Sequence, residues 1–236
     1  MTGFDTGSQK KSELVEAMQT LARVGWMAQR SKRTRNLIMP LGRPRNIGAD
    51  ETLYRIGEMP DGIYGLIRGR VCISTPDDAG SVLDIYMGNP GFWIGDLALF
   101  ARSRRLVTVT AVAPTKVWYL PQSALLELLR PHPELIADFY ALNHQNTAVA
   151  LRLLANLAIP DTERRLAAWL LFSDEALISA DRWIDVSQQQ IGTMNAVSLP
   201  SVRRALKKLE TLELIELGYS KLRVRDRAAL SDFCAS

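Results

Sequence analysis

Apolar and polar positions recur with helical spacing in two short segments late in the chain, residues 188–194 and 199–210. A serine precedes each segment, Ser187 and Ser198, and its hydroxyl can cap the first turn of a helix. Only residues 195–197 separate the segments, which is about the length of a tight turn. We therefore expect two short helices joined by a turn. The residues predicted to form their buried face are Ile191, Val202, Leu206 and Leu209.

The other side of the second helix is predicted to be basic. It carries Arg203, Arg204, Lys207 and Lys208, and no acidic residue lies between Ser187 and Lys208. A helix with one apolar face and one basic face suits insertion into the major groove of DNA. The alternative is an ordinary pair of amphipathic helices whose basic face is only solvated.

Residues from about 43 to 120 follow a different pattern, with short runs of β-branched and aromatic residues separated by Gly, Pro and Asp. The runs are LYRI (53–56), IYGLI (63–67), VCIS (71–74), VLDIYM (82–87), VTVTAV (107–112) and KVWYL (116–120). Many short strands with regular turn signals indicate an antiparallel barrel or sandwich.

Helical spacing returns on both sides of this region. The predicted helices cover 11–30, 122–130, 134–158 and 161–173. We interpret the basic run 31–35 as the solvated end of the first helix; the alternative is a tail that binds nucleic acid. Beyond the two-helix segment, residues 214–224 predict a β-hairpin with its turn at Gly218.

The helix over 134–158 carries a set of residues near a seven-residue spacing. They are Leu142, Val149, Leu153 and Asn156, with Gln145 or Asn146. A seam of this kind could pair with a second copy of the chain as a coiled coil. The alternative is a single helix packed on its own domain, and the spacing fits both.

The composition is that of a globular protein with a sizeable core, because 47% of the 236 residues are hydrophobic and 23% are charged. No run of 18 apolar residues and no apolar segment of signal-peptide type is present, so we expect no membrane association. The cysteines, Cys72 and Cys234, are far apart and lack metal-ligand spacing. Free thiols suit a reducing compartment, so we expect the cytoplasm and no metal site.

The net charge of +4 is a weak sign of an anionic partner. Residues 161–236 hold eleven lysines and arginines against eleven acids, so positive charge in this region is clustered rather than general. Clustering is what phosphate contact needs, but overall neutrality predicts a modest non-specific affinity for DNA.

The order of these elements, together with three motifs, makes the chain resemble the Crp-Fnr family of bacterial transcription regulators. The motifs are ETLYRIGEMPDGIYGLIRGRVCIS (51–74), GNPGFWIGDLALF (88–100) and IGTMNAVSLPSVRRALKKLETLELIEL (191–217). The resemblance implies an α+β protein with an N-terminal antiparallel β-roll or jelly-roll barrel, a long dimerisation helix and a C-terminal winged helix-turn-helix domain. The expected domains are an N-terminal helical segment (1–42), a cyclic-nucleotide-binding-like effector barrel (43–130), the dimerisation helix (131–158) and the DNA-binding domain (159–236).

Family members that bind cyclic nucleotides use a Glu for the ribose hydroxyl and an Arg for the phosphate. The matching positions hold Asp96, which is one methylene shorter, and Arg105. Leu106 replaces the small hydroxyl residue that normally follows this Arg, and the adenine-reading pair falls at Ala150 and Leu151. An unpaired polar group costs about 1–3 kcal/mol, so we expect that the effector is not cyclic AMP.

On this interpretation the residues of the family's pocket are barrel architecture and Arg105 is a surface charge. A different small-molecule effector could still use the pocket, and no cofactor is required. The pocket positions are Gly95, Asp96, Leu97, Arg105, Leu106, Ala150 and Leu151.

The resemblance also assigns phosphate contacts on DNA. Ser198 and Ser201 match positions that bond phosphates at the start of the recognition helix. Gln188 matches a phosphate contact on the first helix, and Lys207 matches a more distal one. These contacts would position the protein on DNA without reading sequence.

Base reading is assigned to the start of the second helix. Arg204 matches a base-reading arginine that can take O6 and N7 of a guanine together. The other two base-reading positions hold Leu199 and Pro200, of which Leu199 could touch a thymine methyl. Arg203 could serve phosphates or bases. The target half-site should therefore differ from that of the best-known family members.

The function expected from the sequence is a sequence-specific transcription regulator that binds a palindromic site as a homodimer. Its partners would be double-stranded DNA, a second copy of itself and RNA polymerase.

An enzyme is not expected, because the barrel segment has no His for a cupin-type metal and the chain has no phosphate loop. An iron–sulfur sensor would need about four cysteines, and the chain has two. Haem sensing lacks an axial His ligand in the barrel, since His132 and His144 lie outside it. The alternative is a ligand-binding regulatory module that acts without specific DNA binding.

Overall fold

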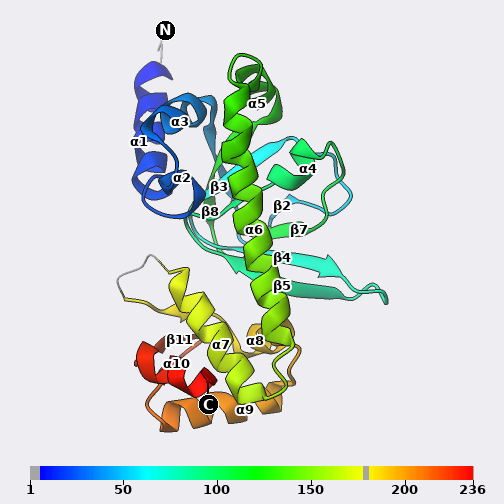
Figure 1. Ribbon diagram of the computed structural model, residues 1–236, viewed down its shortest axis with the longest axis vertical. Helices are drawn as coiled ribbons and strands as arrows, with labels where there is room; N and C mark the ends of the chain where they lie inside the picture. Colours follow the sequence, from blue (N-terminus) through cyan, green and yellow to red (C-terminus); the bar gives the residue numbers. More distant parts are fainter. Residues whose placement is uncertain (1–5, 178–180, 236) are drawn as a thin grey trace. The chain divides into compact units, whose positions relative to one another are not determined.

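The computed structural model describes residues 6–177 and 181–235, which form two compact units. The first unit comprises the described residues up to 75 together with 86–147, and the second comprises 76–85 together with the described residues from 148 onward. Figure 1 shows both units and the long helix α6 that contributes to each. Within the described part of the chain, no helix is both long and apolar enough to cross a membrane.

The strands of residues 43–121 form two four-stranded antiparallel sheets. Their orders are β1-β8-β3-β6 and β2-β7-β4-β5. The strands are β1 (Arg43–Ile47), β2 (Thr52–Tyr54), β3 (Gly62–Arg68), β4 (Val71–Pro76), β5 (Val82–Gly88), β6 (Trp93–Ile94), β7 (Thr108–Ala111) and β8 (Thr115–Pro121). The predicted antiparallel β domain is confirmed. The sequence analysis missed β1 and β6, because β1 contains a proline and three polar residues and β6 has only two residues.

Helices flank the strands in the first unit. They are α1 (Thr6–Leu21), α2 (Gly25–Ala28), α3 (Lys32–Ile38), η1 (Met39–Leu41), α4 (Asp96–Phe100), α5 (Gln122–Leu129), η2 (Pro133–Leu135) and α6 (Ile136–Leu157). The prediction of one helix over 11–30 is wrong, because α1 ends at Leu21 and a separate helix α2 begins at Gly25, whose φ is +72°. A Cβ on Gly25 would lie 2.0 Å from the carbonyl oxygen of Gly91, so only glycine allows this close approach.

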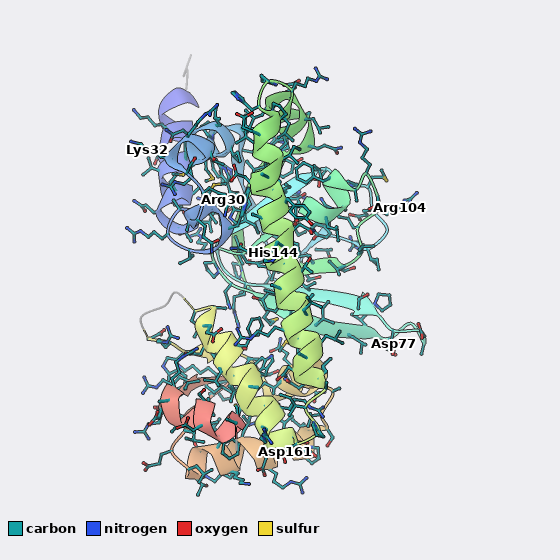
Figure 2. The ribbon with its side chains drawn as sticks, viewed as in Figure 1. Arg30, Lys32, Asp77, Arg104, His144 and Asp161 are labelled. Atoms are coloured by element: carbon teal, nitrogen blue, oxygen red, sulfur yellow. The ribbon has the colours of Figure 1, made fainter. Side chains whose placement is uncertain are left out.

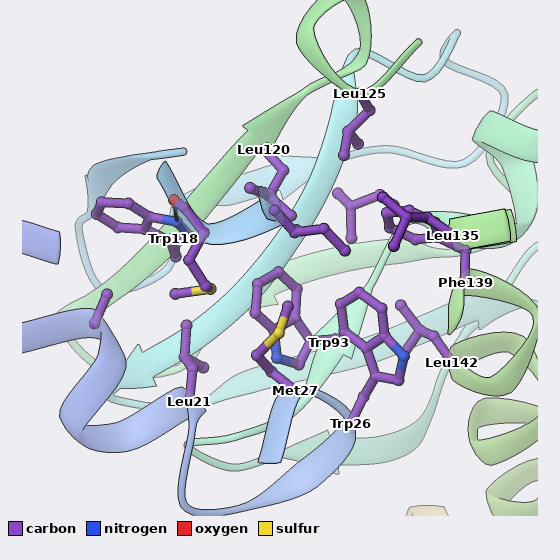
Figure 3. Packing of buried hydrophobic residues seen from close by; sticks show 14 of the residues in the cluster. Leu21, Trp26, Met27, Trp93, Trp118, Leu120, Leu125, Leu135, Phe139 and Leu142 are labelled. Atoms are coloured by element: carbon purple, nitrogen blue, oxygen red, sulfur yellow. Dashed lines mark hydrogen bonds between the residues drawn. The ribbon is translucent and has the colours of Figure 1, made fainter. Parts of the chain in front are cut away.

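The hydrophobic core of the first unit joins the N-terminal helices to the β-strands and α6. Figure 3 shows Trp26 and Met27 packed among Trp93, Phe139 and Leu142. The Trp26 ring lies edge-on to the Trp93 ring, with their centroids 5.2 Å apart. Residues 11–41 are therefore an integral part of this unit's core, which their predicted description as a separate helical segment did not anticipate.

Asp138 on α6 anchors the same N-terminal helices through polar contacts. Trp26 donates from Nε1 to the Asp138 carbonyl oxygen at 2.6 Å, and Arg30 pairs with its carboxylate at 3.0 Å. Thr34, which is buried, donates to the same carboxylate at 3.1 Å. The run 31–35 is thus not a solvated helix end, because Ser31 caps a new helix there and Thr34 packs inward.

The second unit contains helices and a small three-stranded sheet. Its elements are α7 (Thr162–Glu175), β9 (Ile184–Asp185), α8 (Gln188–Asn195), α9 (Leu199–Thr211), β10 (Ile215–Gly218), β11 (Lys221–Val224) and α10 (Arg227–Ala235). The strand order is β10-β11-β9, so the predicted hairpin gains a third strand that the sequence analysis missed along with α10. The predicted C-terminal helix-turn-helix is confirmed by α8 and α9.

Candidate nucleic-acid interface and effector pocket

Helix α8 begins at a reciprocal cap. The Gln190 amide donates to the Ser187 hydroxyl at 3.1 Å, and the Ser187 amide donates to the Gln190 side-chain oxygen at 2.9 Å. This capping box satisfies two backbone donors at the helix start. Gln188, predicted to contact phosphate, follows directly and is half-buried.

The turn between α8 and α9 depends on two small residues. Ala196 takes the left-handed conformation, with φ 52° and ψ 47°, which glycine adopts at lower cost. The Val197 amide then donates to the Gly192 carbonyl at 2.9 Å. A Cβ on Gly192 would lie 2.7 Å from the Val197 carbonyl oxygen, so this position requires glycine. The turn therefore brings the start of α9 close against α8.

Helix α9 presents the predicted basic face to solvent and buries its apolar face. Val202, Leu206 and Leu209 are buried as predicted. The exposed cations are Arg203, Arg204, Lys207 and Lys208.

These cations differ in their local partners. Lys207 pairs with Glu210 on the same helix at 2.9 Å, and Lys208 pairs with Glu163 on α7. Arg204 lies only 3.4 Å from the Ser201 hydroxyl, a weak contact that a DNA base can replace. Arg204 is thus held less firmly by its neighbours than Lys207 and Lys208.

The prediction that the Ser198 hydroxyl caps α9 is wrong. Ser198 occupies the cap position, but its side chain makes no capping bond and donates instead to the Ser201 hydroxyl at 3.0 Å. Pro200 lies in the first turn and lacks one of the N–H groups that a cap would satisfy. Leu199 is half-buried and Pro200 is exposed.

The wing beside these helices carries aromatic and basic groups. Tyr219 at the hairpin tip is 96% exposed. The Lys221 ammonium and the Arg223 guanidinium lie 4.5 and 4.8 Å from the Trp183 ring centroid. A cavity of about 260 Å³, lined by Ser187, Gln188, Tyr219 and Lys221 among others, separates the hairpin from the start of α8.

In the first unit, Arg105 is buried rather than a surface charge, so that expectation is wrong. Its guanidinium donates to the carbonyl oxygens of Gly95 and Gly62, each at 2.9 Å, and to Asp61 at 3.0 Å. It also lies 4.1 Å from the Tyr54 ring centroid, within cation–π range. The sequence analysis missed Asp61 and Tyr54, which lie far from Arg105 in sequence.

Gly95 makes this arrangement possible. It takes a φ of +107° at the start of α4, and a Cβ there would lie 2.7 Å from Arg105 Nη1. A side chain at this position would therefore displace the guanidinium. The predicted neighbours Gly95, Asp96 and Arg105 do come together around the start of α4.

Asp96 is a buried carboxylate at the same place. Asn146 on α6 donates to Asp96 Oδ1 at 3.1 Å. Burial raises the pKa of Asp96, while hydrogen bonding from amide groups, including those of Asn146 and Asn143, acts in the opposite direction.

Two buried polar atoms of the pocket lack a partner among the described residues. They are Asp96 Oδ2, which can accept a hydrogen bond, and Arg105 Nε, which can donate one. Unpaired buried groups are costly for stability. A donor such as a hydroxyl would satisfy the first atom, and an acceptor such as an anionic oxygen would satisfy the second.

The remaining pocket positions lie at the surface. Leu106 is 61% exposed and Leu97 is also exposed. Ala150 and Leu151 are exposed on the part of α6 that belongs to the second unit. Within the described residues, no group of three or more His, Cys, Asp or Glu side chains could hold a metal ion.

The seam predicted on α6 faces inward rather than outward. Leu142 is in the core of the first unit, and Asn146 bonds Asp96. Asn156 bonds Asn195 in the second unit at 3.0 Å. Leu142, Asn146 and Asn156 are thus occupied within their own units, while Val149 and Leu153 of the predicted seam are half-buried.

Comparison with known proteins agrees with both units. A model of the cyclic nucleotide-binding domain matches residues 44–132, and a model of the Crp-like helix-turn-helix domain matches residues 164–233. The chain belongs to the Crp-Fnr family. It is thus a DNA-binding transcription regulator that combines a cyclic-nucleotide-binding-type domain with a helix-turn-helix.

Relatives of this Crp-Fnr regulator include the cAMP-activated global transcriptional regulator CRP of Pasteurella multocida. It is 28% identical over 169 residues, which cover 70% of this chain and 81% of the relative. The transcriptional regulator SdrP of Thermus thermophilus is 27% identical over 180 residues, covering 75% and 85%. Among solved structures, FixK2 from Bradyrhizobium japonicum shares the fold with a TM-score of 0.74 at 21% identity, covering 83% of this chain and 98% of that one.

Proposed function

We propose that this regulator binds a palindromic DNA site as a homodimer, and that its effector is not cyclic AMP. The observation that carries the DNA-reading part is the exposed pair Arg203 and Arg204 on α9, opposite a fully buried apolar face. In this proposal Arg204 reads a guanine, while Gln188, Ser198, Ser201 and Lys207 contact phosphates. The half-site then reflects the leucine and proline at positions 199 and 200.

An exposed stripe on α6 supports the homodimer. Tyr140, His144, Thr147, Leu151 and Leu154 follow one another at alternating spacings of four and three residues, and all five are exposed. Tyr140, Leu151 and Leu154 have exposed fractions of 72%, 61% and 65%. His144 projects from the middle of the helix (Figure 2). This spacing is that of a coiled-coil seam, so a second α6 is the natural cover for it.

The composition of the pocket supports an effector other than cyclic AMP. Ala150 and Leu151 offer no side-chain group that could hydrogen-bond an adenine, and Leu151 belongs to the proposed dimer stripe. Asp96 Oδ2 and Arg105 Nε still suit a hydroxyl and an anionic oxygen. These groups favour a small anion with a hydroxyl group as the effector. Its recognition would not depend on a nucleobase.

Selection of bound duplexes from a random DNA pool tests this function. The purified protein would be used alone, with cyclic AMP and with cyclic GMP. We expect a palindromic consensus without either nucleotide. A consensus that appears only with cyclic AMP would contradict the effector proposal, and a consensus without two-fold symmetry would contradict the dimer. Failure to enrich any sequence would favour a ligand-binding module that acts without specific DNA binding.

A further inference from the structure

Asn195 is the most completely buried polar residue of the second unit's helix-turn-helix. It is the last residue of α8 and has no exposed surface. Its side-chain amide donates to the Ile191 carbonyl at 2.9 Å, and its side-chain oxygen accepts from Asn156 Nδ2 at 3.0 Å. Its backbone carbonyl accepts from Arg165 on α7 at 3.1 Å. One residue thus joins three helices at the start of the reading turn.

The orientation of both asparagines follows from this network. The Ile191 carbonyl can only accept, so the amino group of Asn195 must face it. The oxygen of Asn195 then faces Asn156, which must present its own amino group. The hydrogen bond between the two side chains therefore has one allowed direction.

Stability alone does not explain this polar contact. The Oδ1 atom of Asn156 is buried and has no partner among the described residues. Replacing a buried hydrogen-bonded pair by apolar groups of similar shape is often neutral or stabilising. The polar pair instead fixes a relative orientation. It joins the last turn of α6 to Asn195, which directly precedes the turn that leads into α9.

We propose that Asn156 and Asn195 are positioning residues for DNA reading, although neither lies on the basic face of α9. Asn156 ties the Asn195 side chain to α6, and Arg165 ties the Asn195 backbone carbonyl to α7 while also bonding the Ile159 carbonyl at 2.8 Å. The turn is held from two sides, so the tilt of α9 and the direction of Arg204 are fixed. This inference rests on the proposed sequence-specific binding.

The test measures affinities for the selected consensus duplex and for a scrambled duplex of equal length at one salt concentration. Asn156→Ala should lower the affinity for the consensus about tenfold and change the affinity for the scrambled duplex less than about twofold. Ser173→Ala is the matched control, because it removes one side-chain bond of 2.9 Å within α7 and should change neither affinity.

The double variant Asn156→Leu with Asn195→Val separates positioning from folding. We expect it to melt at or above the temperature of the natural protein and still discriminate about tenfold less well between the two duplexes. Equal losses on both duplexes for Asn156→Ala, or full discrimination by a folded double variant, would overturn the inference. If the natural protein itself selects no consensus, the proposed function has failed instead.

Discussion

Asn146 donates its side-chain amide to Oδ1 of Asp96, and this bond leaves the other oxygen of the buried carboxylate unpaired. Burial raises the pKa of Asp96, so the folded protein holds this proton at pH values where the unfolded chain has released it. The free energy of unfolding should therefore fall as pH rises from about 4, the ordinary pKa of Asp, through the folded value.

Asp96→Asn should remove this part of the pH dependence. We expect the variant to equal the natural protein in melting temperature at low pH and to exceed it increasingly as pH rises through the raised pKa. Thermal unfolding between pH 4 and 8 checks this, with Asp78→Asn on an exposed turn as the control. Parallel curves for the natural protein and Asp96→Asn would show that Asp96 does not titrate in this window.

Ala196→Gly should stabilise the second unit by about 0.5 kcal/mol. A left-handed alanine costs about 1–2 kcal/mol, and the greater freedom of glycine in the unfolded chain offsets part of the gain. Ala148→Gly, an exposed helical site, should instead destabilise by about 1 kcal/mol. Urea unfolding of both variants measures the difference, and a loss of stability at position 196 would contradict the strain we infer.

Leu154→Glu should break the proposed homodimer. The substitution places a charge in the stripe of both copies and removes two leucines that would each contribute about 1.5–3 kcal/mol to dimer stability. The dissociation constant of the dimer should therefore rise at least about 100-fold. Sedimentation measures this, with Leu212→Glu, at another exposed leucine, as the control. An unchanged sedimentation profile would require another dimer surface or a monomer.

Arg204→Ala and Lys207→Ala should affect DNA binding differently. The arginine variant should lose about 1–3 kcal/mol on the consensus and relax one base position, because a bidentate contact to guanine is lost. The lysine variant should weaken all sequences alike and reduce the salt slope by about one. Glu210→Gln is the matching variant, since it frees Lys207 and should raise non-specific affinity. Equal losses of Arg204→Ala on specific and random duplexes would remove it from base reading.

The parts of the fold that follow local patterns could be predicted from the sequence. The two helices within residues 187–211 and the strands of the barrel have strong periodicity and clear turn residues. The break before Gly25 and the orientation of α6 could not be predicted, because both depend on contacts between residues that are distant in sequence. The apolar spacing of α6 fits two faces, and only the packing of Leu142 and Asn146 shows which one turns inward.

The pocket illustrates the same limit at the level of single residues. Resemblance pointed to Asp96 and Arg105, and the structure brings both to the start of α4. Their partners Asp61 and Asn146 carry no local signal, because each is an ordinary polar residue until the fold places it. The role of Asn195 was hidden for the same reason, since it looked like the first residue of a loop.

The packing of Trp26 and Met27 against Trp93 and Phe139 bears on how the first unit can be produced by itself. A fragment limited to the barrel strands would begin near Arg43. It would lack Trp26 and Met27, which cover part of the hydrophobic core. Trp93 would then be exposed to solvent, so we expect such a fragment to aggregate into inclusion bodies. An expression clone of the first unit should therefore begin ahead of α1.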